Sequence, residues 1–219
     1  MEPKETPARR ILILVPIIHT QADMGALGTH IRRQLIKTFG ERWWQSNLGT
    51  VDRVWDEIEA SVNDLDLPYK QLRIYQDGLP VCGRELDIVR ELAAAGSRNH
   101  RLLLELNRRG AAIMGTESGE LLVEEYSRIR GLLESPGQPS PHQDVKASGA
   151  RLIEKRDRFI AARIDATLGR DEIGMLFLGM LHSIAPLLAK DIKSLNLLPF
   201  DSNARQIRQA LRSATQSRQ

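Results

Sequence analysis

The sequence predicts an α/β fold with a mainly parallel sheet of about four to five strands and helices on both faces. Short apolar runs of strand length alternate along the chain with segments in which apolar residues recur every three or four positions. That alternation is typical of a parallel sheet covered by its crossover helices. The length of 219 residues and the 42% hydrophobic content are enough for one core, so we expect a single domain over residues 1–200.

Five segments are predicted to be strands. The first contains the run ILILVPII, which is apolar on both faces, as a central parallel strand would be. The fourth, GMLFLG, is the most hydrophobic, and the fifth is weaker and is expected at an edge of the sheet. In chain order the expected strands are residues 11–19, 70–76, 111–115, 174–179 and 192–197.

Helical periodicity fills the intervals between these strands. Val51, Trp55, Ile58 and Val62 follow one another at spacings of three and four, and we expect this stripe to face the core. The expected helices are residues 26–39, 51–65, 84–95, 99–109, 119–133 and 150–168.

Two segments depart from this pattern in composition. Residues 135–149 contain three prolines and little to bury, so we expect a loop there, with an active-site lid as an alternative. Residues 201–219 form a basic C-terminal tail whose four arginines and one aspartate give 4 − 1, or +3, which equals the net charge of the chain. A helix there could contact nucleic-acid phosphates, but the scarcity of aromatic residues favours a solvated tail without that partner.

The sequence also favours a cytoplasmic protein. The single cysteine, Cys82, cannot form an internal disulfide, which indicates a reducing compartment. The apolar run 11–18 ends after eight residues with no small-residue cleavage site, so it does not resemble a secretory signal. No run approaches the roughly 20 apolar residues that a membrane span needs, and we expect none.

Polar side chains follow four of the expected strands. His19 follows the first, Asp77 the second, Glu117 the third and His182 the fourth. Ligands of open α/β sheets bind beyond the carboxyl ends of the strands, where these side chains would meet. Imidazole and carboxylate together suit zinc, manganese, cobalt or iron, and an open position on such an ion lowers the pKa of a bound water. We therefore predict a divalent transition metal held by His19, His182 and Glu117, with hydrolysis as the chemistry.

Each of these residues also has a structural interpretation. A histidine after a buried strand often makes only a structural hydrogen bond, Asp77 precedes a glycine and can hold a turn, and Glu117 can stabilise the dipole of the following helix. Coincidence at four strand ends favours the functional interpretation. The remaining histidines, His30, His100 and His142, are expected to have no part in the site.

Arg156 stands inside the apolar stripe of the helix expected at 150–168, between Ile153 and Ile160. A guanidinium in that position either extends to the rim or pairs with a carboxylate or a substrate oxyanion. The candidate catalytic residues are therefore Arg156, as stabiliser of a developing oxyanion, and Glu117 and Asp77, as metal ligand or general base.

Two short motifs accompany these residues. Residues 179–182 form a GxxH motif after the helix that carries Arg156 and Asp157, whereas residues 16–19 read PIIH, with proline in place of the glycine. In this order of landmarks the chain resembles the TraB/PrgY and Tiki superfamily, which includes erythromycin-esterase-like and ChaN-like proteins. The resemblance implies a metal-dependent protease or hydrolase, with Glu117 as the family acid, Asp77 as a further one, and Asp157 where the family has asparagine.

Two functions are compatible with these patterns. The first is a metal-dependent hydrolase that acts on a peptide or ester bond of a small-molecule or peptide substrate. The alternative is a non-catalytic sensor or scaffold that holds a small ligand at the same edge. Phosphate-loop, Rossmann and serine-hydrolase motifs are absent, since the serine of residues 115–119 stands one position too late for GxSxG. Cys82 could be a thiol nucleophile or soft ligand, although we expect a small buried residue.

Overall fold

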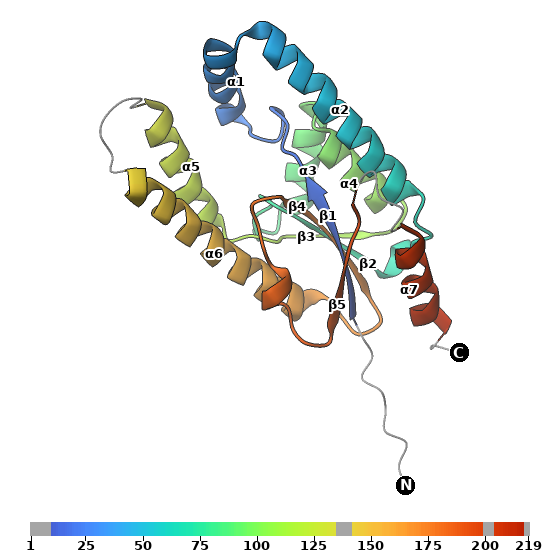
Figure 1. Cartoon of the computed structure of the whole chain (residues 1–219). Helices are drawn as coiled ribbons and strands as arrows, with labels where there is room; N and C mark the ends of the chain where they lie inside the picture. Colours follow the sequence, from blue (N-terminus) through green and yellow to red (C-terminus); the bar gives the residue numbers. More distant parts are fainter. Residues whose placement is uncertain (1–9, 135–141, 199–203, 217–219) are drawn as a thin grey trace.

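The computed structural model describes residues 10–134, 142–198 and 204–216. Its centre is a five-stranded sheet in which every pair of neighbouring strands is parallel (Figure 1). The strand order β3-β2-β4-β1-β5 places β4 at the centre and β5 at an edge. The strands are β1 (Arg10–Ile17), β2 (Leu72–Gln76), β3 (Ala112–Met114), β4 (Ile173–Gly179) and β5 (Ile192–Asn196). The predicted fold class, the five strands and the edge position of the fifth are confirmed.

Strand β1 supplies side chains to two separate cores. Ile11, Ile13 and Val15 belong to the larger core, whereas Leu12 belongs to the smaller core on the other face. Successive side chains of a strand point to opposite faces, so a strand covered on both sides must be apolar at every position. This is the physical reason for the uninterrupted ILILVPII run.

Helices cover both faces of the sheet (Figure 1). The larger core receives side chains from α2 (Glu41–Asn63), α3 (Glu85–Ala94), α4 (Arg98–Arg108) and α7 (Ala204–Gln216). The smaller core receives Ile160 and Ile164 of α6 (His142–Thr167), against which α5 (Gly119–Glu134) packs. Helix α1 (Ala26–Phe39) packs on α2, and two short 3-10 helices, η1 (Tyr69–Gln71) and η2 (Ala185–Leu187), complete the described elements.

Two helices begin earlier than predicted. Helix α2 starts at Glu41, ten residues before the expected position, because only Gly40 separates it from α1. The φ of 88° at Gly40 is in the left-handed region that glycine adopts readily, so one residue reverses the chain. Helix α6 starts at His142, so residues 142–149 are helical and the loop expected there is wrong for that half; residues 135–141 lie outside the described residues.

The basic segment near the C-terminus is a packed helix. Ile207 and Leu211 of α7 are buried in the larger core, and Arg208 pairs with Asp64 at the end of α2. The expected solvated tail is therefore wrong for residues 204–212, because an apolar pair one turn apart gives this short arginine-rich helix a face to bury.

Among the described residues, no helix combines the length and the apolar character that crossing a membrane requires.

Candidate functional site

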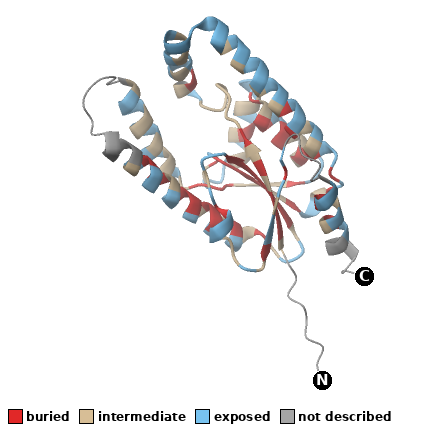
Figure 2. Ribbon diagram, in the orientation of Figure 1, coloured by how far each residue is buried: buried red, intermediate tan, exposed pale blue. Residues whose placement is uncertain are grey.

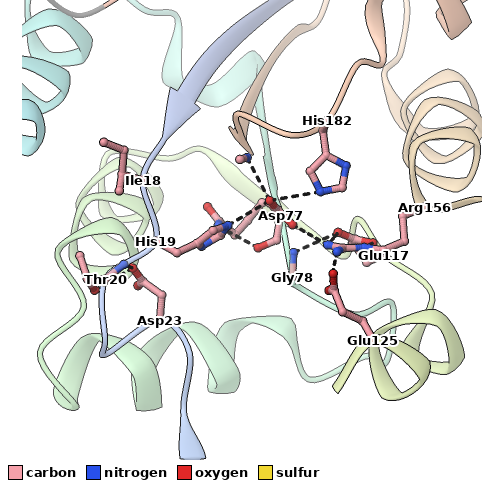
Figure 3. Close-up of polar contacts among 12 residues, drawn as sticks. Ile18, His19, Thr20, Asp23, Asp77, Gly78, Glu117, Glu125, Arg156 and His182 are labelled. Atoms are coloured by element: carbon pink, nitrogen blue, oxygen red, sulfur yellow. Dashed lines mark hydrogen bonds and ion pairs between the residues drawn. The ribbon is translucent and has the colours of Figure 1, made fainter. Parts of the chain in front are cut away.

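The residues predicted from the four strand ends lie together at the carboxyl edge of the sheet (Figure 3). The strand order β3-β2-β4-β1 sets the ends of these strands side by side. Glu117, Asp77, His182 and His19 therefore follow one another along one edge, with Asp77 in contact with both histidines.

Asp77 is the centre of the cluster. Its Oδ2 accepts a hydrogen bond from the backbone N–H of Gly179 at 2.9 Å and lies 3.1 Å from His19 Nε2 and 3.6 Å from His182 Nε2. A Cβ on Gly179 would lie 2.8 Å from this same oxygen and 3.1 Å from His19 Nε2. The glycine of the GxxH motif is thus required for the carboxylate and the imidazole to approach the end of β4.

Glu117 is completely buried beside Asp77. The chain beyond β2 and β3 stays paired, since Val81 N–H donates to the Glu117 carbonyl at 2.9 Å and Glu117 N–H donates to Leu79 at 3.0 Å. This pairing turns the Glu117 side chain toward Gly78, whose N–H donates to Oε1 at 3.2 Å. Backbone hydrogen bonds therefore hold both carboxylates in place.

Arg156 contacts three carboxylates. Its Nε and Nη2 donate to the two oxygens of Glu117 at 2.9 and 2.6 Å, Nη2 also donates to Asp77 Oδ1 at 2.7 Å, and Nη1 donates to Glu125 at 2.5 Å. The guanidinium is buried, so of the two alternatives for this helix position the structure selects the carboxylate pairing. Four of its five N–H donors are engaged, and its role toward a substrate oxyanion stays a prediction.

Asp157 orients the imidazole of His182. Its Oδ1 lies 2.5 Å from His182 Nδ1, and its Oδ2 accepts from Ser183 N–H at 2.9 Å. Nδ1 is thereby occupied and Nε2 is turned toward Asp77, the carboxylate–histidine arrangement typical of metal-binding histidines. The sequence pattern alone does not predict this role for Asp157, although its place next to Arg156 on α6 is a usable signal.

The charges of the cluster shift its pKa values. Burial raises the pKa of Asp77, but the hydrogen bond and charge of His19, with His182 and Arg156, lower it overall. Burial lowers the pKa of His19, but Asp77 outweighs that effect and raises it above the ordinary 6.5. For Glu117 burial dominates and raises the pKa, although Arg156 opposes the shift. Burial lowers the pKa of Arg156, and its three carboxylates more than reverse this.

The donor set of this cluster fits a metal ion. Asp77, Glu117 and His182 each offer one ligand atom, and these atoms all lie within 4.8 Å of one another. The cluster and the side chains in direct contact with it include four carboxylates and one guanidinium. The carboxylates are those of Asp77, Glu117, Glu125 and Asp157, and the guanidinium is that of Arg156. Counted with both histidines neutral, the formal sum of these groups is −4 + 1, or −3, which a divalent cation would offset in part. The cluster could therefore bind a metal.

The structure groups these candidate ligands differently from the sequence. Asp77, predicted as a catalytic group, stands with Glu117 and His182 in the candidate metal cluster. His19 contacts Asp77 but is not part of that group, and its side chain is the more exposed imidazole, at 35%. The roles assigned to these residues stay predictions.

Hydrogen bonds hold the loop after β1, which carries His19, at two points. Trp55 Nε1 on α2 donates to the Ile18 carbonyl at 3.2 Å. Asp23 Oδ2 accepts from the N–H of Thr20 at 2.6 Å, and its Oδ1 contacts the hydroxyl of Ser97, which caps α4. Burial raises the pKa of Asp23, but hydrogen bonds, first that of His100, lower it to about 2.

The structure overturns two predictions made from the sequence, one about His100 and one about Cys82. His100, which was expected to have no part in the site, is buried and lies 2.7 Å from the Ser97 hydroxyl, so it helps to hold the loop of His19. Its burial follows from the amphipathic character of α4, whose buried residues include His100, Leu103 and Leu106. Cys82 is exposed, and the expected small buried residue is wrong.

Fold and site together define an α/β protein with a buried histidine–carboxylate cluster at the carboxyl edge of its sheet. No protein-family model, no curated protein and no solved structure matches this chain. Membership of the TraB/PrgY and Tiki superfamily stays a prediction from the motifs.

Proposed function

We propose that the protein is a divalent-metal-dependent hydrolase that acts on a peptide or ester bond. The observation that carries the proposal is the grouping of Asp77, Glu117 and His182, whose ligand atoms all lie within 4.8 Å of one another. The GxxH motif at residues 179–182 and its resemblance to a superfamily with metal-dependent proteases support the same function.

The proposed role of each site residue depends on how far its side chain is exposed to solvent. A bound transition metal would supply a Lewis acid and lower the pKa of a water molecule. Asp77, Glu117 and His182 are the ligands, and Asp157 keeps the Nε2 of His182 free for binding. His19 is the partly exposed imidazole, so it is the group placed to meet a substrate and to hold or move a proton at Nε2.

Arg156 acts as a positioning residue in this proposal. It is buried and gives two hydrogen bonds to Glu117 and one to Asp77, which fixes the orientation of both carboxylates. An arginine can do this because its planar fork matches a carboxylate with two parallel hydrogen bonds.

The test is the metal content of the untagged protein after incubation with zinc, manganese, cobalt or iron. We expect about one ion per chain, a loss of at least about tenfold in affinity for His182→Ala and Glu117→Gln, and hydrolysis of a peptide and ester panel that requires the metal. His30→Ala, on the exposed surface of α1, is the matched control and should bind as the wild type does. Folded protein that takes up none of the four metals would contradict the proposal.

Gly179→Ala tests the geometry without removing any ligand. The added Cβ would meet Asp77 Oδ2 and His19 Nε2, so we expect weaker metal binding and loss of turnover in a protein that still folds. Gly131→Ala is the control, because a Cβ at that helical position meets nothing within 4 Å. Unchanged metal affinity and turnover in Gly179→Ala would count against the assigned site.

A non-catalytic ligand-binding protein is the second candidate function. The observation that favours it is that Asp77, Glu117, Arg156 and Asp157 are all buried and already hydrogen-bonded to one another or to His182. Metal or small-ligand binding without turnover across the panel would select this function, whereas turnover lost with His19→Ala would exclude it.

A further inference from the structure

Helix α1 and the first part of α2 form a hairpin that projects beyond the carboxyl edge of the sheet (Figure 1). Across residues 27–50 the only buried residue is Gly28, and the rest are exposed or half-buried, as the tan and pale blue ribbon shows (Figure 2). The part of α2 that packs on the sheet begins further along, with Trp55, Ile58 and Val62. The hairpin therefore contributes little to the core that holds the fold together.

The tip of this hairpin carries large apolar side chains in solvent. Phe39 and Trp43 are 55% and 39% exposed and stack with ring centroids 4.6 Å apart across the Gly40 turn. Leu48 is 38% exposed. Trp44, Leu48, Val51 and Trp55 continue one stripe of α2, whereas Trp43 lies about 100° away from Trp44 around the helix and stacks on Phe39 of α1. Neither Phe39 nor Trp43 belongs to either core of the sheet, so burial there does not account for their apolar character.

Positive charge surrounds these aromatic rings. Arg32, Arg33, Lys37 and Arg42 are exposed, and within the described chain none of the four has a carboxylate within 4.0 Å. Glu41 is the single acid between residues 26 and 44, so the hairpin tip has a formal charge of 4 − 1, or +3. Arg32 lies over the ring of Trp44, 5.9 Å from its centroid, which keeps one cation beside the aromatic tip.

We propose that this hairpin tip, residues 32–48, binds the surface of an anionic lipid bilayer. Tryptophan and phenylalanine enter the interfacial region, and arginine and lysine contact lipid phosphates, the combination found in interfacial membrane anchors. The Phe39 and Trp43 rings stack on each other, so one face of each ring is already used within the hairpin and is not open to a base. A second copy of the chain would bring two +3 surfaces together, so charge opposes a self-association through the tip.

The proposal is independent of the proposed hydrolase. It also predicts how the protein is oriented on the membrane, because the hairpin follows directly from the loop that carries His19 and projects from the same edge of the sheet. Binding would therefore turn the candidate metal cluster toward the membrane surface.

The test is co-sedimentation of the full chain with vesicles of phosphatidylcholine alone and with vesicles that contain 30% phosphatidylglycerol. We expect at least about tenfold stronger partition to the anionic vesicles, weakened by raising the salt from about 0.1 to 0.5 M. Phe39→Ser with Trp43→Ser should reduce partition at least about tenfold, and Arg32→Gln with Arg33→Gln and Lys37→Gln should remove the salt dependence. Val123→Ser, at a residue that is 65% exposed on α5, is the matched control and should leave partition unchanged.

A second measurement identifies which residue of the hairpin tip contacts the lipid. Trp43 fluorescence, in a Trp44→Phe background in which Trp55 is buried, should be quenched by brominated lipid, and Trp43→Phe should abolish the quenching. The proposal is overturned if the wild type does not bind anionic vesicles, if the serine variants bind as well as the wild type, or if Trp43 mediates a dimer in solution or RNA retention without vesicle binding. Metal content should stay the same in all these variants, which separates failure of this proposal from failure of the metal site.

Discussion

Arg156 shows how a single buried side chain can decide whether a site is stable. Three carboxylates surround it, and it is 4% exposed. Removing one partner of such a network leaves charge buried without compensation, which destabilises a protein far more than the loss of a surface ion pair.

We expect Arg156→Met to lower the free energy of unfolding by about 3–5 kcal/mol, because Glu117 and Asp77 lose their cation in a buried environment. Urea denaturation measures the change. Arg158→Gln removes a neighbouring arginine that is exposed and paired with the exposed Glu154, and should change stability by less than about 1 kcal/mol. If Arg156→Met is as stable as Arg158→Gln, the buried network does not exist as described.

Asp23 predicts a pH dependence of folding. Its folded pKa of about 2 lies below the ordinary 3.8, so its contribution is fully present above about pH 4 and is lost as the pH falls toward 2. Asp23→Asn should therefore destabilise the protein by about 2 kcal/mol at pH 7, and the difference from the wild type should narrow below about pH 4.

Urea denaturation between pH 7 and pH 3 measures this difference. Asp52→Asn, at a carboxylate that is 67% exposed, is the control and should change stability by about 0.5 kcal/mol or less. A wild-type advantage over Asp23→Asn that stays constant down to pH 3 would show that folding does not lower the pKa of Asp23.

At the scale of an element, α7 shows that burial rather than charge determines where a helix lies. Its arginines face outward or pair with Asp64, while Ile207 and Leu211 complete the larger core. We expect Ile207→Ala to destabilise the protein by about 2–4 kcal/mol, since it leaves a cavity between α7 and the sheet.

Urea denaturation followed by tryptophan fluorescence, to which Trp55 in the same core contributes, measures this change. Gln206→Ala alters the preceding exposed residue and should stay within about 0.5 kcal/mol of the wild type. Equal stability of the two variants would mean that α7 is not docked in solution.

The two helix starts that the sequence missed have one cause. Periodicity identifies a helix by recurring apolar residues, and neither the sequence of residues 41–50 nor that of residues 142–146 has apolar residues recurring over two full turns. Apolar spacing found the part of α2 at Val51 and beyond because that part packs on the sheet.

For the whole molecule, the central sheet and the projecting hairpin should differ in local stability. Backbone amides of β1 and β4 lie between two cores, whereas α1 packs chiefly on α2 and has almost no buried residue. We expect the amides of α1 to exchange with solvent at least about 100-fold faster than those of β4 in hydrogen–deuterium exchange.

Helix α4 provides the comparison within the same experiment. Leu102, Leu103 and Leu106 bury one of its faces, so its amides should be protected like those of the sheet. Protection of α1 equal to that of α4 would show that the hairpin is held by contacts that the present structure does not contain.

The sequence by itself determined the fold class, the five strands and the four polar residues at their carboxyl ends, because these features depend on local patterns of apolar residues and on a general rule for parallel sheets. Only the tertiary structure decided which groups touch. Arg156 contacts Glu117, which is 39 residues away in the sequence, and Asp77, which is 79 residues away. Asp157 contacts His182, which is 25 residues away. Such contacts depend on strand order and on the rotation of a helix against the sheet, and a local pattern of residues does not contain either quantity.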